Sequence, residues 1–107
     1  MSINNNLKTE DLLLTEAARP QIKEPPMYSV VLLNDDFTPM DFVTAVLQKF
    51  FALSEQRAVE IMWKVHTTGR GVCGLFTRDI AETKAVQITN YSRQHLHPLM
   101  CSIEPSQ

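Results

Sequence analysis

Apolar positions along the chain separate a core-forming region from a polar amino-terminal segment. Residues 27–33 (MYSVVLL) form a short, β-branched apolar run, which is typical of a buried strand. Residues 72–76 (VCGLF) and 99–103 have the same character. We therefore predict three strands, the first of them buried.

Three helices are predicted between these strands, because apolar residues recur there at spacings of three and four. Thr38 is expected to cap the first helix, with Pro39 as its first residue. Ser54 is expected to cap the second helix, which Gly69 ends, and Thr77 the third. The three apolar stripes comprise Val43, Val46, Leu47 and Phe50, then Ala58, Ile61, Met62 and Val65, and finally Ala81, Ala85 and Ile88.

The predicted order is strand, helix, helix, strand, helix, strand. The simplest arrangement of these elements is a compact α+β domain of two layers, with helices packed on a three-stranded sheet. A chain of 107 residues has the length of one domain, and residues 27–107 are predicted to form it.

Residues 1–26 differ from the rest of the chain in composition. They contain three of the six prolines, seven charged residues and no aromatic residue. Their main apolar cluster is the short run at residues 12–14. Such a segment buries too little apolar surface to offset its ordering entropy, so we predict a flexible amino-terminal extension. A short helix that docks on a partner is the alternative.

The charge balance limits the classes of function. Ten Lys and Arg residues against twelve Asp and Glu residues give a net charge of −2, which argues against a nucleic-acid-binding protein. No apolar run approaches the roughly 20 residues that span a bilayer, and the amino terminus does not resemble a secretory signal. We expect a cytoplasmic protein that binds neither nucleic acid nor a membrane.

Two apparent motifs, one for dinucleotide binding and one for metal binding, are not supported by their context in the sequence. Residues 69–74 (GRGVCG) match G-x-G-x-x-G, but they follow a predicted helix and lead into a strand, the reverse of a dinucleotide site. His95, His97 and Cys101 could be read as metal ligands, yet a structural zinc site needs four. Cys73 and Cys101 both fall in apolar strands, where free thiols act as small hydrophobic groups. We predict neither a metal nor a cofactor.

The best candidate site combines polar and apolar groups. Asn34, Asp35 and Asp36 follow the first strand, and His66 lies in the last turn of the second helix. If these elements pack together, their acceptors would suit an ammonium group, which has three donors and no acceptor. The adjoining apolar pocket would be formed by Met40, Val43, Met62 and Val65.

Other interpretations of the same residues stay open at this point. The acidic turn is also typical of ordinary turn and capping chemistry, which would leave a purely structural interaction domain. Asp35 or Asp36 with His66 could instead form the acid–base pair of a small hydrolase, although no nucleophile is placed beside them.

Four segments point to a known family. NDDFTPMDFV at residues 34–43, VHTTGRGVCGLFT at 65–77, AETK at 81–84 and HPLMCSIE at 97–104 closely resemble the ClpS family in order and spacing. ClpS proteins are bacterial adaptors that deliver N-degron substrates to the ClpA unfoldase of the ClpAP protease. The resemblance covers all of residues 27–107, and it implies an antiparallel sheet and a non-enzymatic adaptor without a cofactor.

The resemblance also implies roles for individual residues. Asn34, Asp35 and His66 would hold the free α-amino group of a substrate's first residue. A pocket for Leu, Phe, Tyr or Trp would be formed by Thr38, Met40, Val43, Met62, Val65 and Leu99. Met40 would exclude β-branched side chains.

The resemblance implies a second contact, with the amino-terminal domain of ClpA. The matching positions at the start of the third helix are Asp79, Thr83 and Lys84, and the amino-terminal extension would assist substrate handover. Asp79 stands where the family commonly has glutamate. Trp63 stands where a smaller residue is expected, and by the helical wheel we predict it to be a surface residue without a role in the pocket.

Overall fold

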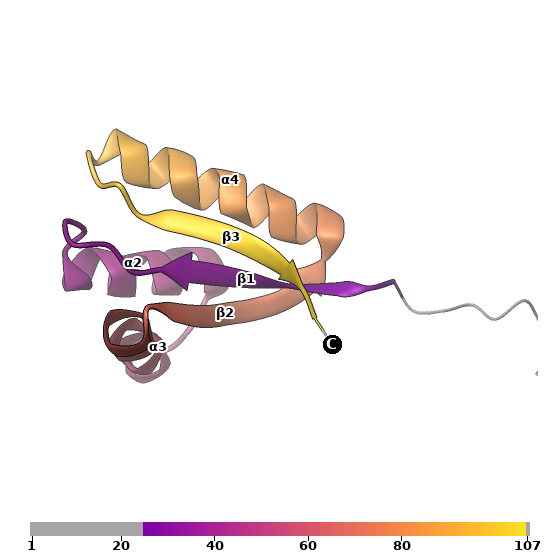
Figure 1. The fold of residues 1–107 in the computed structure, drawn as a ribbon, viewed down its shortest axis with the longest axis horizontal. Coiled ribbons are helices and arrows are strands. Elements are labelled where there is room, and N and C mark those ends of the chain that lie inside the picture. Colours follow the sequence, from indigo (N-terminus) through magenta and orange to yellow (C-terminus); the bar gives the residue numbers. More distant parts are fainter. Residues whose placement is uncertain (1–24, 107) are drawn as a thin grey trace, which may run out of the picture.

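The structure, a computed structural model, describes residues 25–106. The predictions for residues 1–24, a flexible extension or a docking helix, lie outside the described residues. Six elements follow one another in the predicted order (Figure 1). They are β1 (Met27–Leu33), α2 (Met40–Phe51), α3 (Glu55–Thr68), β2 (Arg70–Thr77), α4 (Arg78–Gln94) and β3 (Met100–Pro105).

The sheet has the strand order β2-β1-β3, and both pairings are antiparallel. The central position of β1 explains its apolar sequence, because Val30, Val31 and Leu32 are completely buried. The register of β1 with β2 shifts between Val30 and Val31, which leaves Cys73 as an extra residue in β2. The predicted antiparallel three-stranded sheet is confirmed.

All three helices contribute to one hydrophobic core against the sheet. The buried cluster contains residues from each helix together with Leu32 of β1 and Cys73 of β2. These two sheet residues share the face that α3 approaches at Gly71. The opposite face is more open, with Val72, Leu75 and Met100 each about half exposed. The predicted two-layer arrangement is therefore confirmed.

The predicted helix boundaries are largely confirmed, with one error. The Ser54 hydroxyl accepts from the Arg57 N–H, and Gly69 ends α3 in a left-handed conformation with φ of 94°. The prediction that Thr38 caps α2 is wrong. Pro39 is the N-cap residue, because its carbonyl accepts the first helical hydrogen bonds from α2. The Thr38 hydroxyl donates to Asp35 instead.

Two further predictions on element ends need revision. β2 begins at Arg70, two residues before the predicted start, because it pairs with the end of β1 directly after Gly69. Thr77 does occupy the N-cap position of α4, but its side chain makes no capping hydrogen bond. Asp79 lies in the first turn of α4, where a negative charge suits the helix dipole.

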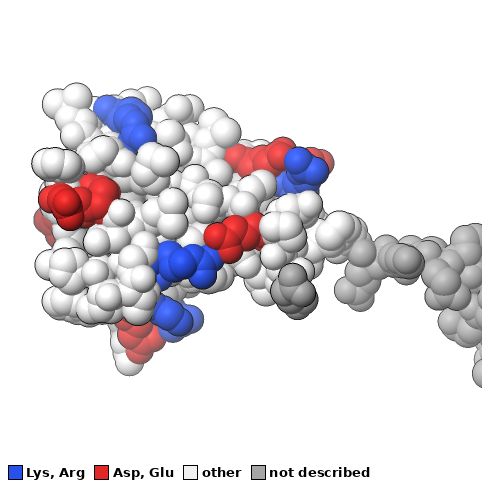
Figure 2. All heavy atoms as spheres, viewed as in Figure 1, with Lys and Arg blue, Asp and Glu red and all other residues white. Residues whose placement is uncertain are grey.

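Charged side chains are dispersed over the surface. On the face shown in Figure 2, acidic and basic groups alternate between wider uncharged areas. One ion pair, Arg70–Glu104, links the two outer strands across β1. Within residues 25–106, no helix is both long and apolar enough to cross a bilayer.

Gly71 sets the distance between α3 and β2. A Cβ atom on Gly71 would lie 2.7 Å from Val65 Cγ2 and 3.3 Å from Ile61 Cγ2. We expect Gly71→Ala to lower the free energy of unfolding by about 1–3 kcal/mol, because the added methyl group overpacks this contact. Denaturant unfolding measures the change, with Val72→Ala on the exposed face as the control. Equal stability of Gly71→Ala and the parent would contradict this packing.

Candidate functional site

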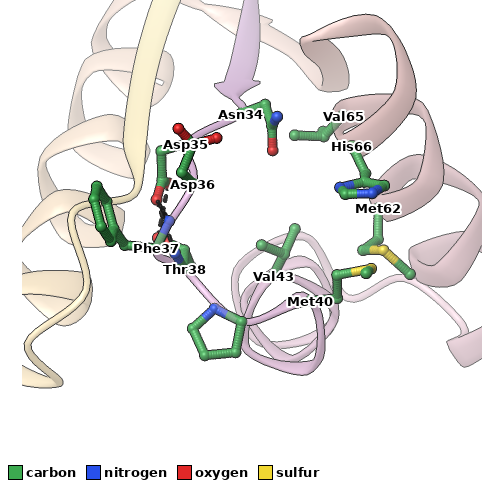
Figure 3. A pocket seen from close by; sticks show the side chains of 11 residues that line it. Asn34, Asp35, Asp36, Phe37, Thr38, Met40, Val43, Met62, Val65 and His66 are labelled. Atoms are coloured by element: carbon green, nitrogen blue, oxygen red, sulfur yellow. Dashed lines mark hydrogen bonds between the residues drawn. The ribbon is translucent and has the colours of Figure 1, made fainter.

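A cavity of about 360 Å³ opens where the end of β1, the start of α2 and the last turns of α3 meet (Figure 3). Its lining combines one polar and one apolar group of residues. The lining residues are Asn34, Asp35, Asp36, Phe37, Thr38, Pro39, Met40, Val43, Met62, Val65 and His66. Residues from two separate parts of the chain therefore form one site.

A backbone hydrogen bond fixes the polar end of this cavity. The Asn34 N–H donates to the Gly69 carbonyl over 2.9 Å, while the Gly69 N–H donates to the Val65 carbonyl over 3.0 Å. The residue that ends α3 is thereby tied to the residue that follows β1. As a consequence, Asn34 after β1 and His66 on α3 border the same cavity (Figure 3).

Asp35 organises the turn between β1 and α2. Its Oδ1 accepts from the N–H groups of Phe37 and Thr38 over 2.8 and 2.7 Å. Its Oδ2 accepts from the Thr38 hydroxyl over 2.8 Å. A carboxylate offers about four lone-pair sites, so these three bonds leave room for one more donor.

The same hydrogen bonds stabilise the charged form of Asp35. Desolvation by burial raises the pKa of this carboxyl, but the Thr38 hydroxyl and the two backbone N–H groups lower it further than burial raises it. The net pKa lies below the ordinary value, so Asp35 carries its negative charge at neutral pH.

On α3, His66 lines the cavity and Trp63 lies beside it. Their rings lie 5.7 Å apart in an edge-to-face arrangement. Trp63 is 49% exposed, which confirms that it points away from the core. Trp63 does not line the cavity, although its ring packs beside His66, which does. The i, i+3 spacing on one helix brings the two rings together.

The apolar part of the cavity is continuous with the core. Val43, Met62 and Val65 are almost fully buried, whereas Met40 at the start of α2 is 42% exposed. Met40 is therefore placed at the mouth, where a flexible thioether side chain can adapt to what enters. The cavity offers oxygen and nitrogen acceptors at one end and an apolar floor at the other.

This geometry favours binding over acid–base catalysis. Among residues 25–106, no hydrogen bond joins Asp35 to His66, because the carboxylate is engaged by its own turn. The Thr38 hydroxyl donates to a weakly basic carboxylate and is not activated as a nucleophile. A negative charge next to an apolar pocket suits a ligand that carries a cation beside an apolar group.

Comparison with known proteins identifies the family. A family model described as "ATP-dependent Clp protease adaptor protein ClpS" matches residues 23–102. The chain belongs to the ClpS family. It is 58% identical over 89 residues to the ATP-dependent Clp protease adapter protein ClpS of Alkalilimnicola ehrlichii, covering 83% of this chain and 84% of that protein.

A solved ClpS structure has the same fold. It is Agrobacterium tumefaciens ClpS2 bound to L-phenylalaninamide, with a TM-score of 0.75 and 43% sequence identity. The match covers 78% of this chain and 100% of that chain. The family is thus an adaptor of an ATP-dependent Clp protease rather than a protease itself.

The structure brings together most of the residues predicted for the ClpS pocket, with one exception. Leu99 is 1% exposed and belongs to the core cluster, not to the residues that line the cavity. It lies directly before β3, where its side chain completes the core under the sheet. Phe37 and Pro39 line the cavity but were not predicted as site residues. Their position inside the NDDFTP turn was the available signal.

The residues predicted to contact ClpA lie on α4, on a different part of this ClpS domain. Asp79 and Thr83 are exposed and one helical turn apart. Lys84 is more enclosed, because its Nζ donates to the Phe50 carbonyl over 2.7 Å and lies over the rings of Phe51 and Phe76. Lys84 therefore also has a structural role.

The cysteines and histidines that the sequence suggested as possible metal ligands take part in packing instead. Cys73 and Cys101 are free thiols, and desolvation by burial raises the pKa of each to about 12. His95 and His97 pack against the Phe42 ring. Within the described part of the chain, no three His, Cys, Asp or Glu side chains are grouped as a metal site requires.

Asp35→Asn tests the charged turn. The pKa of Asp35 is lowered on folding, so its charge stabilises the fold above the ordinary carboxyl pKa near 4, and this contribution disappears as pH falls through the lowered value. We expect Asp35→Asn to lower the free energy of unfolding by about 1 kcal/mol at pH 7 and by less at pH 3.

Denaturant unfolding at the two pH values measures this difference. Asp36→Asn is the matched control, because Asp36 is exposed and its side chain makes no hydrogen bond within residues 25–106. An equal loss for both variants, or a loss that does not depend on pH, would contradict the assignment.

Proposed function

We propose that this ClpS-family protein binds substrates through the free α-amino group and side chain of an amino-terminal Leu, Phe, Tyr or Trp. It then delivers them to the ClpA unfoldase for degradation by ClpAP in the cytoplasm. The observation that carries this proposal is the cavity in which Asn34, Asp35 and His66 adjoin an apolar floor.

The polar end of the cavity suits an α-ammonium group. Such a group has three N–H donors, and the cavity presents the Asn34 amide oxygen, the free acceptor capacity of Asp35 and an imidazole nitrogen of His66. The Asp35 charge adds electrostatic attraction. A charge-assisted hydrogen bond in this setting contributes about 1.5–3 kcal/mol.

The apolar end suits an unbranched or aromatic side chain. Burying Leu or Phe against Val43, Met62 and Val65 contributes roughly 1.5–3 kcal/mol. Met40, at the mouth, would narrow the entrance against side chains that branch at Cβ. We expect micromolar affinity, which corresponds to a binding free energy of about −8 kcal/mol.

A ligand of another ClpS protein combines the same two groups, an amine and an apolar side chain. L-phenylalaninamide, named with the Agrobacterium ClpS2 structure, has a free amine, a benzyl side chain and an amide in place of the next peptide bond. It therefore represents the first residue of a polypeptide. We infer that the equivalent residue of a substrate occupies the cavity here.

Delivery requires a second contact that leaves the cavity free. We propose that Asp79, Thr83 and Lys84 on α4 bind the amino-terminal domain of ClpA, and that residues 1–26 assist handover. Asp79 and Thr83 are exposed on α4, whereas the cavity is formed by β1, α2 and α3. An adaptor with this arrangement can hold substrate and unfoldase together.

A peptide that begins with Phe tests the cavity. We expect micromolar binding of the free peptide and at least about 100-fold weaker binding of its N-acetylated form, which lacks the charge and adds bulk among the acceptors. Trp63 is the sole tryptophan and lies beside His66, so its emission should change on binding.

Titration by Trp63 fluorescence, with calorimetry as a second readout, measures both affinities. His66→Ala should weaken binding about tenfold, whereas Lys64→Ala on the exposed side of α3 should not. Equal affinity for the free and acetylated peptides would refute the proposal. Cleavage of the peptide would instead support the hydrolase interpretation.

Substitutions on α4 test delivery. We expect Thr83→Arg to stop ClpAP from degrading a reporter that begins with Phe, because a large cation replaces a small side chain at the proposed ClpA contact. Peptide affinity should not change. Gln94→Arg, exposed at the far end of α4, is the control for added charge. Normal degradation with Thr83→Arg would exclude this surface.

A further inference from the structure

A second hollow lies next to the cavity, at the carboxyl end of α4. It has a volume of about 530 Å³, and its lining is mainly apolar. The lining residues are Phe37, Arg93, Leu96, His97 and Pro98, here called the α4-end groove. Phe37 and Leu96 are 79% and 89% exposed, the highest values among the exposed large hydrophobic residues.

Folding does not explain the leucine at position 96. The His97 N–H donates to the Ser92 carbonyl over 2.9 Å, and the Leu96 N–H donates to the Arg93 carbonyl over 3.0 Å. These two bonds form a Schellman motif in which Leu96, with φ of 63°, holds the left-handed position. Gly or Asn is usual there, because other L-residues are strained. A strained and exposed apolar side chain indicates a binding role.

The groove has a fixed shape. Arg93 Nη1 donates to the carbonyls of His97 and Leu99 over 2.8 and 3.1 Å, which holds the connection from α4 to β3. The His97 ring packs edge-on against Phe42 at 4.4 Å between centroids. The Arg93 and His97 walls and the backbone between them are therefore preorganised, and a ligand would not have to order this part of the groove.

Phe37 connects the groove to the cavity, since it lines both. Its N–H is held by Asp35, and its ring points away from the cavity towards the connection between α4 and β3 (Figure 3). A peptide that leaves the cavity on this side passes over Phe37. Each extended residue advances by roughly 3.3–3.6 Å, so two or three further residues span roughly 7–11 Å.

We propose that the α4-end groove binds an apolar side chain from the second, third or fourth residue of the substrate whose first residue occupies the cavity. This inference rests on the proposed function, because it requires the amino terminus to be anchored beside Asp35. Continuity through Phe37 and the exposed Leu96 favour an apolar side chain, and the Arg93 guanidinium at the rim disfavours a cationic one.

A leucine scan of a short peptide tests the groove. The parent peptide is Phe followed by four Gly residues and a labelled Lys, and Leu replaces Gly at the second, third or fourth position in turn. We expect one of these peptides to bind the full-length protein about fivefold more tightly than the parent, since an open groove provides only part of full leucine burial.

Leu96→Asn should reduce this gain to less than twofold, because the substitution removes the apolar wall. Asn suits the left-handed conformation, so the variant should fold at least as stably as the parent. Val86→Asn is the matched control: Val86 is 58% exposed on α4 but does not line the groove, and its variant should retain the fivefold gain.

The outcomes separate the two proposals. If the parent peptide binds but no leucine position improves affinity, or if the gain survives in Leu96→Asn, the groove is not a subsite and the cavity proposal stands. If N-acetylated Leu-containing peptides bind equally well, the groove is an independent surface and the inference is wrong. If no free-amine peptide binds, the proposed function fails and the inference fails with it.

Discussion

The geometry of the site depends on Gly69. Its left-handed conformation ends α3, and its carbonyl accepts the Asn34 N–H at the point where β1 ends. One residue therefore positions the polar turn after β1 and the last turn of α3, which carries His66. A side chain with a Cβ atom is strained at φ of 94°, so glycine is required for backbone reasons. The cavity exists because two distant segments meet at this residue.

The close packing of α3 on the sheet also determines the geometry of the site. Gly71 admits Val65 of α3 against β2, and Val65 is both a core residue and part of the cavity floor. The packing of the core therefore sets the position of the cavity floor. Asp35 completes the arrangement, because its carboxylate orders the turn by three hydrogen bonds and still carries a charge towards the cavity. One side chain thus combines an observed structural role with the proposed binding role.

The separation of surfaces is consistent with an adaptor of a Clp protease. The cavity uses β1, α2 and α3, while the exposed positions Asp79 and Thr83 lie at the start of α4. The α4-end groove lies at the other end of the same helix, beside Phe37. The proposed binding surfaces are therefore all exposed in the folded domain, and no conformational change is needed to reach them.

The sequence by itself determined the elements and their order, because apolar spacing, Ser54 and Gly69 are local signals that act within a few residues. It also indicated that the acidic turn and His66 share a site. Only the tertiary structure decided which neighbours each side chain meets. The Thr38 hydroxyl donates to Asp35, and Pro39 occupies the N-cap position of α2. Leu99 belongs to the core. Trp63 packs beside His66. These outcomes depend on competition between contacts distant in the chain, which local patterns do not encode.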